Sequence, residues 1–367
     1  MAGSFHAIKD AGFNCVHTWE GYGIGDIIGE LRSANLQLIK HWPTDAEVSG
    51  YAADPNILAW YLDEEPAAQI YLDAQRSGDS TLMGRRYQEF LSRFSAIKAL
   101  DARHPIFSLG TAWIPPDSRE WWERWSTAGD ITAHDDYSLL STTTDFESLT
   151  KAVQLAVAIN REEKPMWLTL QAFTGTSERK SELLMPSPEE LRGMAFTSVI
   201  HGATGLIFFA LDSRVTREGL VIGIAPDTPT AYEAYAQATP TEVRQSRALW
   251  AGAAALNAEL NRLTPELLSP TSVVSYRVYY SGESYTRSPI RTMLKVRGSR
   301  YTLLAANIER QAFGVRFEFA RDIASVRRLN PDGSRTLLRP QGQMFSDSLG
   351  QFGVGVYEIR FRHRPHE

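Results

Sequence analysis

Short apolar segments alternate with amphipathic segments along roughly the first 265 residues of the chain. The apolar segments have hydrophobic residues on both faces, which is typical of buried parallel strands. The segments between them place hydrophobic residues at helical spacing, as Tyr87, Phe90, Leu91 and Phe94 do within 82–100. This alternation predicts an α/β fold with a parallel sheet. The expected strands are 13–19, 36–40, 56–62, 105–109, 130–134, 166–170 and 205–210.

A doubly wound sheet and a (β/α)₈ TIM barrel both produce this alternation. The length up to about residue 265 fits a barrel. No glycine-rich phosphate loop follows any expected strand, which disfavours a nucleotide-binding sheet. We therefore predict a TIM barrel over 1–265. A barrel needs an eighth strand, and it would precede the helix that begins near Phe5. The first strand is thus expected to be missing at the N-terminus, and an incomplete barrel or open sheet is the alternative.

The pattern changes after a proline-bounded segment at 265–270. Short strands now follow one another without helices, separated by turn sequences such as Asn-Pro-Asp-Gly at 330–333. This pattern predicts an antiparallel β-sandwich over 271–367. Its expected strands are 272–280, 292–296, 301–306, 314–319, 325–329 and 354–361.

Composition narrows the classes of partner. The net charge of -5 argues against nucleic acid, and no apolar run approaches the roughly 18 residues of a membrane helix. The single cysteine, Cys15, excludes an intrachain disulfide and a cysteine metal site. Residues 1–4 show no signal peptide. The protein would be secreted or periplasmic if a signal peptide preceded this start, and cytoplasmic otherwise.

The ends of the expected strands carry polar and aromatic side chains, whereas the strand bodies are apolar. In a parallel barrel the active site lies at the carboxyl ends of the strands. Trp19, Trp42 and Trp113 occupy equivalent places, and an indole face stacks well on a sugar ring. The strand ends therefore predict a carbohydrate site. Its candidate residues are His17, Trp19, Glu20, His41, Trp42, Asp63, Glu64, Glu65, Trp113, His134, Asp135, Asp136, Tyr137, Gln171, Phe173 and Asp212.

Three consecutive carboxylates, Asp63, Glu64 and Glu65, follow one of these strands and precede Pro66. The proline cannot donate a ladder hydrogen bond, so the strand should end there. Carboxylates this close repel each other, and a pKa raised by that repulsion suits general acid catalysis near neutral pH.

The sequence Trp-Tyr-Leu-Asp-Glu-Glu-Pro at 60–66 resembles the end of the fourth strand in (β/α)₈ glycoside hydrolases related to clan A. In that group an acidic or amide residue, then Glu, then Pro mark the acid/base. Residues 164–171 are similar to the seventh strand and 202–209 to the eighth, and a trailing sandwich is common there. The resemblance implies that Glu65 is the general acid/base and that Glu64 holds the amide-or-acid position.

The chain departs from this family at the nucleophile, which is a Glu at the end of the seventh strand. That place holds Leu170 or Gln171, and neither can act as a nucleophile. A second carboxylate could come from another strand, and we favour Asp135 or Asp136 over Asp212 or Glu20. Alternatively, a 2-acetamido group of the substrate attacks with Glu64 orienting it, or the protein binds sugar without cleaving it. The separation of the carboxyl groups indicates retention at about 5–5.5 Å and inversion at about 6.5–9.5 Å.

We therefore expect a glycoside hydrolase that cleaves an oligo- or polysaccharide without a cofactor. Glu65 would protonate the leaving oxygen, with its pKa raised by Glu64 or Asp63, and Asp135 or Asp136 would act as nucleophile or base. The sugar subsites would be formed by Trp19, Trp42, Trp113 and Tyr137. Hydrogen bonds to hydroxyl groups would come from His17, His41, His134 and Gln171.

Two rival hypotheses remain at this level. His17, His41 and His134 end strands near acids, which would suit a metal-dependent barrel hydrolase or isomerase, although no His-x-His pair is present. The absent family nucleophile instead favours a non-catalytic carbohydrate-binding barrel.

Overall fold

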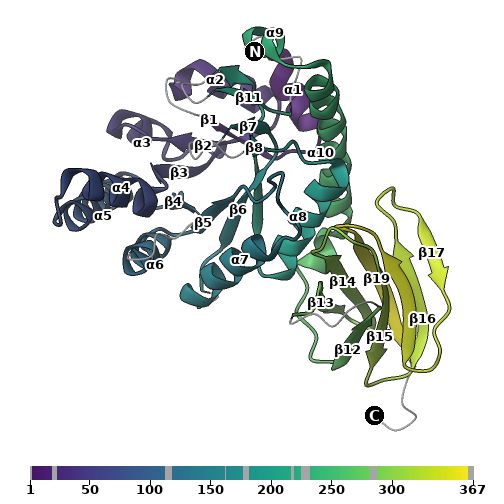
Figure 1. Ribbon diagram of the computed structural model, residues 1–367. Coiled ribbons are helices and arrows are strands. Elements are labelled where there is room, and N and C mark those ends of the chain that lie inside the picture. The colour runs from purple at the N-terminus through teal and green to yellow at the C-terminus, as the bar shows by residue number, and fades with distance from the viewer. Residues whose placement is uncertain are drawn as a thin grey trace.

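The first part of the chain forms a curled parallel sheet surrounded by helices (Figure 1). The computed structural model describes residues 2–18, 23–111, 118–161, 163–176, 182–215, 219–224, 232–281 and 287–362. The strands follow one another in the sheet in chain order, and every pair is parallel. They are β1 (Cys15–Thr18), β2 (Gln37–His41), β3 (Ile57–Glu64), β4 (Ile106–Thr111), β5 (Thr132–Asp136), β6 (Met166–Gln171) and β9 (Gly205–Phe209). The predicted alternation of strands and helices is confirmed.

The helices that cover the outside of this sheet begin where the sequence carries capping signals. Thr44, Ser187 and Thr239 each accept a hydrogen bond from the backbone of a glutamate three residues on, and that glutamate bonds back. The helices are α1 (Ala2–Asp10), α2 (Ile24–Ser33), α3 (Asp45–Tyr51), α4 (Pro66–Ser77), α5 (Leu82–Leu100), α6 (Arg119–Ala128), α7 (Glu147–Ile159), α8 (Pro188–Ile200), α9 (Tyr232–Gln237) and α10 (Pro240–Leu267). None of these described helices has the length and apolarity needed to cross a membrane.

Strand alternation divides the hydrophobic residues of the sheet between two sides. Along β3, Ala59 and Tyr61 face the inside of the curl, whereas Trp60 and Leu62 pack against the helices. A small antiparallel sheet lies in the segments that follow β6 and β9. It contains β7 (Thr174–Thr176), β8 (Glu182–Leu183), β10 (Arg214–Val215) and β11 (Leu220–Ile222).

The last part of the chain is the expected antiparallel sandwich. One sheet has the order β12-β15-β18 and the other β13-β14-β19-β16-β17. The strands are β12 (Tyr276–Tyr280), β13 (Ile290–Arg297), β14 (Arg300–Asn307), β15 (Phe313–Phe319), β16 (Ile323–Leu329), β17 (Arg335–Leu338), β18 (Met344–Leu349) and β19 (Val354–Phe361). The sequence pattern did not predict β17, which is largely exposed, or β18, in which three of the six residues are Ser or Asp.

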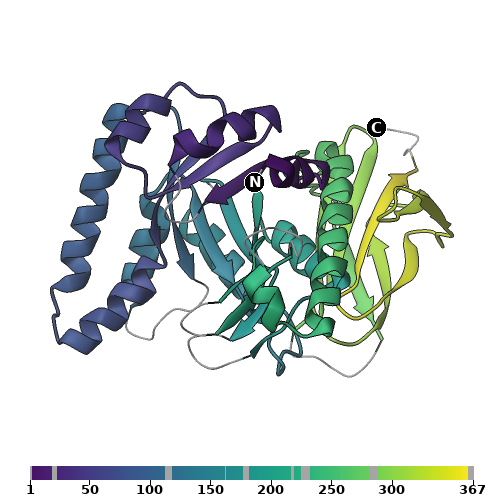
Figure 2. The same ribbon diagram turned by 90° about the horizontal axis from the view of Figure 1, so that it is seen from above.

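The helix before the sandwich extends into the proline-bounded segment at 265–270. α10 begins at Pro240, which suits the first helical turn, and continues past Pro265 to Leu267. Figure 2 shows α10 lying between the curled sheet and the sandwich.

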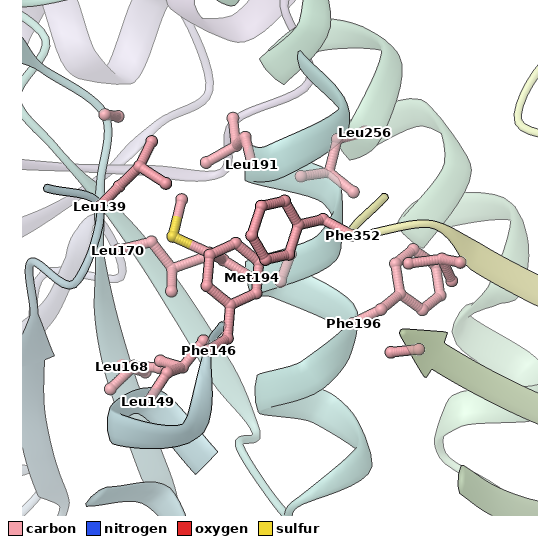
Figure 3. Close-up of a cluster of buried hydrophobic side chains, with 14 of the residues drawn as sticks. Leu139, Phe146, Leu149, Leu168, Leu170, Leu191, Met194, Phe196, Leu256 and Phe352 are labelled. Atoms are coloured by element: carbon pink, nitrogen blue, oxygen red, sulfur yellow. The ribbon is translucent and has the colours of Figure 1, made fainter. Parts of the chain in front are cut away.

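A single hydrophobic cluster crosses the junction between the two parts (Figure 3). It joins buried residues of β6, α7, α8 and α10 to residues of β14 and β19. Phe146, next to α7, stacks on Phe352, next to β19, with ring centroids 4.1 Å apart. Arg192 of α8, which is half-buried, forms an ion pair with the buried Glu259 of α10 at 2.7 Å and donates to the Val354 carbonyl at 3.0 Å. The sandwich is therefore packed on the helical layer through a continuous core.

Candidate active site

A β-bulge decides which of the three consecutive acids faces the inside of the curl. The register between β3 and β4 shifts between Tyr61 and Glu64. Strict alternation would place Asp63 on the same side as Tyr61, but the bulge brings Glu64 there instead. The Tyr61 hydroxyl donates to the Glu64 carboxylate, and Glu64 lines a cavity. The carboxylate of Asp63 instead interacts with Arg86 and Glu89 of α5, so the structure separates Asp63 from the other two acids.

Glu65 has a left-handed backbone conformation, with φ 40° and ψ 44°. It is the N-cap of α4 and precedes Pro66, which disfavours the right-handed helical region for the residue before it. Its backbone N–H donates to the Leu109 carbonyl on β4 at 2.7 Å. A non-glycine residue in this region costs on the order of 1–3 kcal/mol. The side chain of Glu65 forms a hydrogen bond with Asp135 at the end of β5.

Glu64, Glu65 and Asp135 thus form one carboxyl cluster. Burial raises the pKa of Asp135, and the charges of Glu65 and Glu64 and the hydrogen bond with Glu65 raise it further. Burial and the charge of Glu65 raise the pKa of Glu64 to about 8, although Arg214 opposes the shift. Two carboxyl groups in hydrogen-bond contact favour a shared proton over two negative charges. The cluster therefore holds protons at neutral pH.

Tyr137 connects this cluster to an aromatic wall. Its side chain forms a hydrogen bond with Asp135, and burial is the main cause that raises its pKa. Its ring lies edge-on to Phe173 at 5.2 Å and stacks on Phe209 at 5.7 Å. The Arg214 guanidinium lies 5.3 Å from the centre of the Phe209 ring. Rings and carboxyl groups side by side can hold the apolar and polar faces of a sugar together.

A cavity of about 300 Å³ opens beside the cluster. Glu64, Tyr137 and Asp212 are among the expected site residues that line it. Asp212 also approaches Arg214, with Oδ1 and Nη1 3.8 Å apart. Side chains from the ends of β3 and β5 and from the segment after β9 therefore meet at this cavity.

The two histidines of the first strands belong to a ring stack on the same side as Glu64. The His41 ring stacks on Tyr61 at 4.1 Å and on Trp42 at 4.2 Å, and His17 lies 5.1 Å from Tyr61. Burial lowers the pKa of His17 to about 4 and that of His41 to about 3, so both rings are neutral at physiological pH. Trp42 is 44% exposed and has a left-handed φ of 46°.

His134 points toward α6 and away from the cavity. Its ring nitrogen lies 2.9 Å from the Ser126 hydroxyl, and its ring centroid is 4.6 Å from Trp122. Burial lowers its pKa to about 3. Asp136 follows the same alternation and bonds with Ser138, while burial raises its pKa to about 6. His134 therefore lies apart from the carboxyl cluster, whereas the charge of Asp136 still contributes to the raised pKa of Asp135.

Gln171 is fully buried and occupied by backbone hydrogen bonds. Its Oε1 accepts from the Leu139 N–H at 2.9 Å, and its Nε2 donates to the carbonyls of Leu139 at 3.1 Å and Leu184 at 2.8 Å. The side chain therefore connects the segments that follow β5 and precede α8. Trp19, Glu20 and Trp113 lie outside the described residues.

Three members of the arrangement were missed by the sequence argument. Tyr61 lies within an apolar run that was interpreted only as core, and Phe209 ends such a run. Arg214 comes shortly after β9 and after Asp212. The only sign in the sequence that Arg214 could reach the site was this position of a cation just beyond a strand end. Within the described ranges, no group of three or more His, Cys, Asp or Glu residues is arranged to hold a metal ion.

Comparison with known proteins shows the class of fold. No protein-family model and no curated protein matches the sequence. The β-galactosidase of Bacillus circulans sp. alkalophilus is similar in structure, with a TM-score of 0.58 at 9% identity over 98% of this chain and 96% of that one. An Anoxybacillus α-amylase has a TM-score of 0.55 at 12% identity over 99% and 90%. The β-galactosidase of Rahnella sp. R3 has 0.57 at 9% over 97% and 95%.

These similarities confirm the fold that the sequence predicted. The chain has the fold of TIM-barrel glycoside hydrolases that carry a C-terminal β-domain. Seven parallel strands of that barrel are present in the described residues.

Proposed function

We propose that the protein is a glycoside hydrolase that cleaves an O-glycosidic bond of an oligo- or polysaccharide. The observation that supports this most directly is the hydrogen bond between Glu65 and Asp135, at the carboxyl ends of β3 and β5, the two strands on either side of β4. Glycoside hydrolysis generally requires two carboxyl groups that flank the scissile bond. The fold of known glycosidases supports the same conclusion.

In the proposed mechanism, the hydrogen-bonded pair holds one proton in the free protein, and substrate binding separates the pair so that this proton is available from Glu65 and Asp135 is left ionised. Glu65 transfers the proton to the glycosidic oxygen as the bond to the anomeric carbon breaks. Asp135 attacks that carbon and forms a glycosyl ester. Glu65, now ionised, takes a proton from water, whose oxygen displaces Asp135 and releases the sugar.

Retention of anomeric configuration is the expected outcome. Retaining enzymes hold their carboxyl groups about 5–5.5 Å apart, whereas inverting enzymes leave about 6.5–9.5 Å for a water molecule. A directly hydrogen-bonded pair is closer to the first arrangement. Tyr61 and Tyr137 would orient Glu64 and Asp135.

A non-catalytic carbohydrate-binding barrel is the second candidate. Gln171 favours it, because this residue stands where related barrels are expected to carry their nucleophile and its amide is occupied by backbone bonds. This alternative predicts sugar binding that survives the loss of either carboxyl group, without turnover.

Substitution of each carboxyl group tests the proposal on a panel of aryl β-galactosides, aryl α-glucosides and malto-oligosaccharides. We expect Glu65→Gln and Asp135→Asn each to lower kcat by about 10²–10⁴-fold. Asp136→Asn is the matched control, because Asp136 lies on the same strand and bonds with Ser138 instead. Equal loss in all three variants, or binding without turnover in the unmodified protein, would contradict a catalytic Glu65–Asp135 pair.

A further inference from the structure

The two sheets of the sandwich have different surroundings. The outer face of the five-stranded sheet, with Leu304 and Val356, belongs to the cluster shared with the barrel. The inner faces of both sheets form a core of their own, with Leu303 and Phe317. The outer face of the three-stranded sheet β12-β15-β18 is therefore turned away from the barrel. We call it the Tyr279 face, and its outward positions, all exposed or half-buried, are Arg277, Tyr279, Gly314, Arg316, Glu318, Met344, Ser346 and Ser348.

Tyr279 supplies the aromatic ring of this face, and two neighbours fix its orientation. Arg316 stands opposite Tyr279 in the pairing of β12 with β15, and its guanidinium lies 4.6 Å from the centre of the ring. The Tyr279 hydroxyl donates to the Glu318 carboxylate at 2.7 Å. A ring that is 36% exposed is thus oriented on the surface without being buried. A ligand that stacks on such a ring loses less conformational entropy on binding.

Guanidinium groups give the Tyr279 face donors for an anion. Arg277 stands opposite Glu318, but in the described part of the chain the two form no ion pair, and Glu318 accepts from Tyr279 instead. The guanidinium of Arg316 stacks on the ring and keeps its in-plane N–H groups for an anion. Residues 271–367 contain sixteen Lys and Arg against eight Asp and Glu, although the whole chain has a net charge of -5. A negatively charged partner is therefore attracted to the sandwich and repelled by the barrel.

The row of residues beside Tyr279 carries only small side chains. Gly314 pairs with Ser348 on β18, and its N–H donates to the Ser281 hydroxyl oxygen at 3.0 Å. A Cβ atom at position 314 would meet that oxygen at 3.2 Å. No side chain in this row is larger than a hydroxymethyl group, so a flat ligand can lie against the Tyr279 ring and reach the serine hydroxyls.

We propose that the Tyr279 face binds an acidic polysaccharide, whose pyranose units carry carboxylate or sulfate groups. The C–H face of one pyranose stacks on the Tyr279 ring. A carboxylate or sulfate of the chain accepts hydrogen bonds from Arg316 and Arg277, whose planar groups match such anions. A protein partner is disfavoured, because the half-buried Met344 is the one aliphatic-chain residue among the described outward positions. The inference rests on the proposed function only in taking a polysaccharide as the partner.

Binding of the full chain to immobilised polymers at physiological ionic strength tests the proposal. The probes are polygalacturonate, which carries carboxylates, and dextran sulfate, which carries sulfates. The controls are dextran, which has no charge, and polyglutamate, which has carboxylates but no pyranose rings. We expect the better of the two probes to bind at least about tenfold more tightly than either control. Absence of binding to both probes, or binding to polyglutamate as tight as to the better probe, would overturn the proposal.

Variants of the Tyr279 face locate the binding. Tyr279→Ala and Arg316→Ala should each weaken binding of the better probe at least about tenfold, and Tyr279→Phe, which keeps the ring, by less than about threefold. Arg300→Ala is the matched control, because Arg300 is an exposed arginine on β14 in the other sheet, and it should bind as the unmodified protein does. Thermal unfolding confirms that the variants are folded. Unchanged binding in Tyr279→Ala, or an equal loss in Arg300→Ala, would overturn the proposal.

The outcome of this test is separate from that of the proposed function. Binding is measured without turnover, so a protein that cleaves no glycoside would still give a result for the Tyr279 face. Conversely, Tyr279→Ala should leave the hydrolysis of a small aryl glycoside unchanged, because the Tyr279 face is turned away from the barrel.

Discussion

Two residues with left-handed backbones stand at neighbouring strand ends, and both belong to the candidate site. Glu65 directly follows β3 and Trp42 directly follows β2, with φ of 40° and 46°. Such conformations persist only where the surroundings enforce them, and they concentrate at functional sites. At Glu65 the enforcing groups are Pro66 and the bond to the Leu109 carbonyl. The strain therefore supports a role for Glu65 beyond packing.

Comparison of Glu65→Gly with Glu65→Ala isolates this strain. Both variants remove the carboxyl group, but only glycine adopts the left-handed region without a steric penalty. We expect the free energy of unfolding in urea to be about 1 kcal/mol higher for the glycine variant than for the alanine variant. A glycine variant as stable as, or less stable than, the alanine variant would show that the backbone at this position is relaxed.

The pKa of Glu64 makes a second prediction at the residue scale, about stability. The folded value of about 8 lies above the ordinary value of 4.5, so between these values the folded state binds more protons than the unfolded state. The free energy of unfolding should therefore fall as the pH rises from about 4.5 to about 8. Asp136 contributes in the same direction between 3.8 and about 6. Below both of these pH ranges, the contribution of Glu64 and Asp136 to the free energy of unfolding is fully present.

Glu64→Gln should reduce the slope above pH 6, where Asp136 no longer contributes and the raised pKa of Asp135 accounts for what remains. The measurement is urea unfolding at a series of pH values, with Glu89→Gln on α5 as the control. A slope that is unchanged in Glu64→Gln would contradict a buried, protonated Glu64.

At the scale of elements, the sequence predicted the seven strands of the curled sheet to within two residues at their ends, but not which way their last side chains point. The Asp63-Glu64-Glu65 run was correctly placed at a strand end. The bulge that turns Glu64 inward and Asp63 toward α5 arises from pairing with β4, which periodicity does not reveal. The direction of the His134 side chain was not predicted for a related reason, because strand alternation points it toward Ser126 and Trp122. Which side chains become buried, and which residues they contact, depends on how the strands pair in the assembled sheet.

Gln171 illustrates this difference and gives a prediction. Gln171→Glu would restore the residue that related barrels use as nucleophile, yet it replaces two donated hydrogen bonds by a buried carboxylate. We expect no gain of activity and a loss of stability of about 2–5 kcal/mol, since the two backbone carbonyls lose their donor and the new buried charge is not compensated. Gln171→Met, which loses the bonds without adding a charge, should lose less. Turnover that rises in Gln171→Glu would show that this side chain reaches substrate.

At the scale of the whole molecule, the continuous cluster across the junction predicts that barrel and sandwich unfold together. All nine tryptophans precede residue 251, so tryptophan fluorescence reports only on the barrel. Phe352→Ala in the sandwich should therefore lower the midpoint measured by fluorescence as much as that measured by circular dichroism. The expected loss is about 3–5 kcal/mol. Separate midpoints for the two signals would show that the parts are independent.

The Arg192–Glu259 pair has a consequence for how related chains would differ from this one. Its two members come from helices far apart in the sequence, and one of them also binds a strand of the other domain. Substitution of one member alone would leave the other as an unpaired charge in the junction. Substitution of both by apolar residues would be tolerated. Across homologues, positions 192 and 259 should therefore change as a couple, with lone substitutions at either one rare.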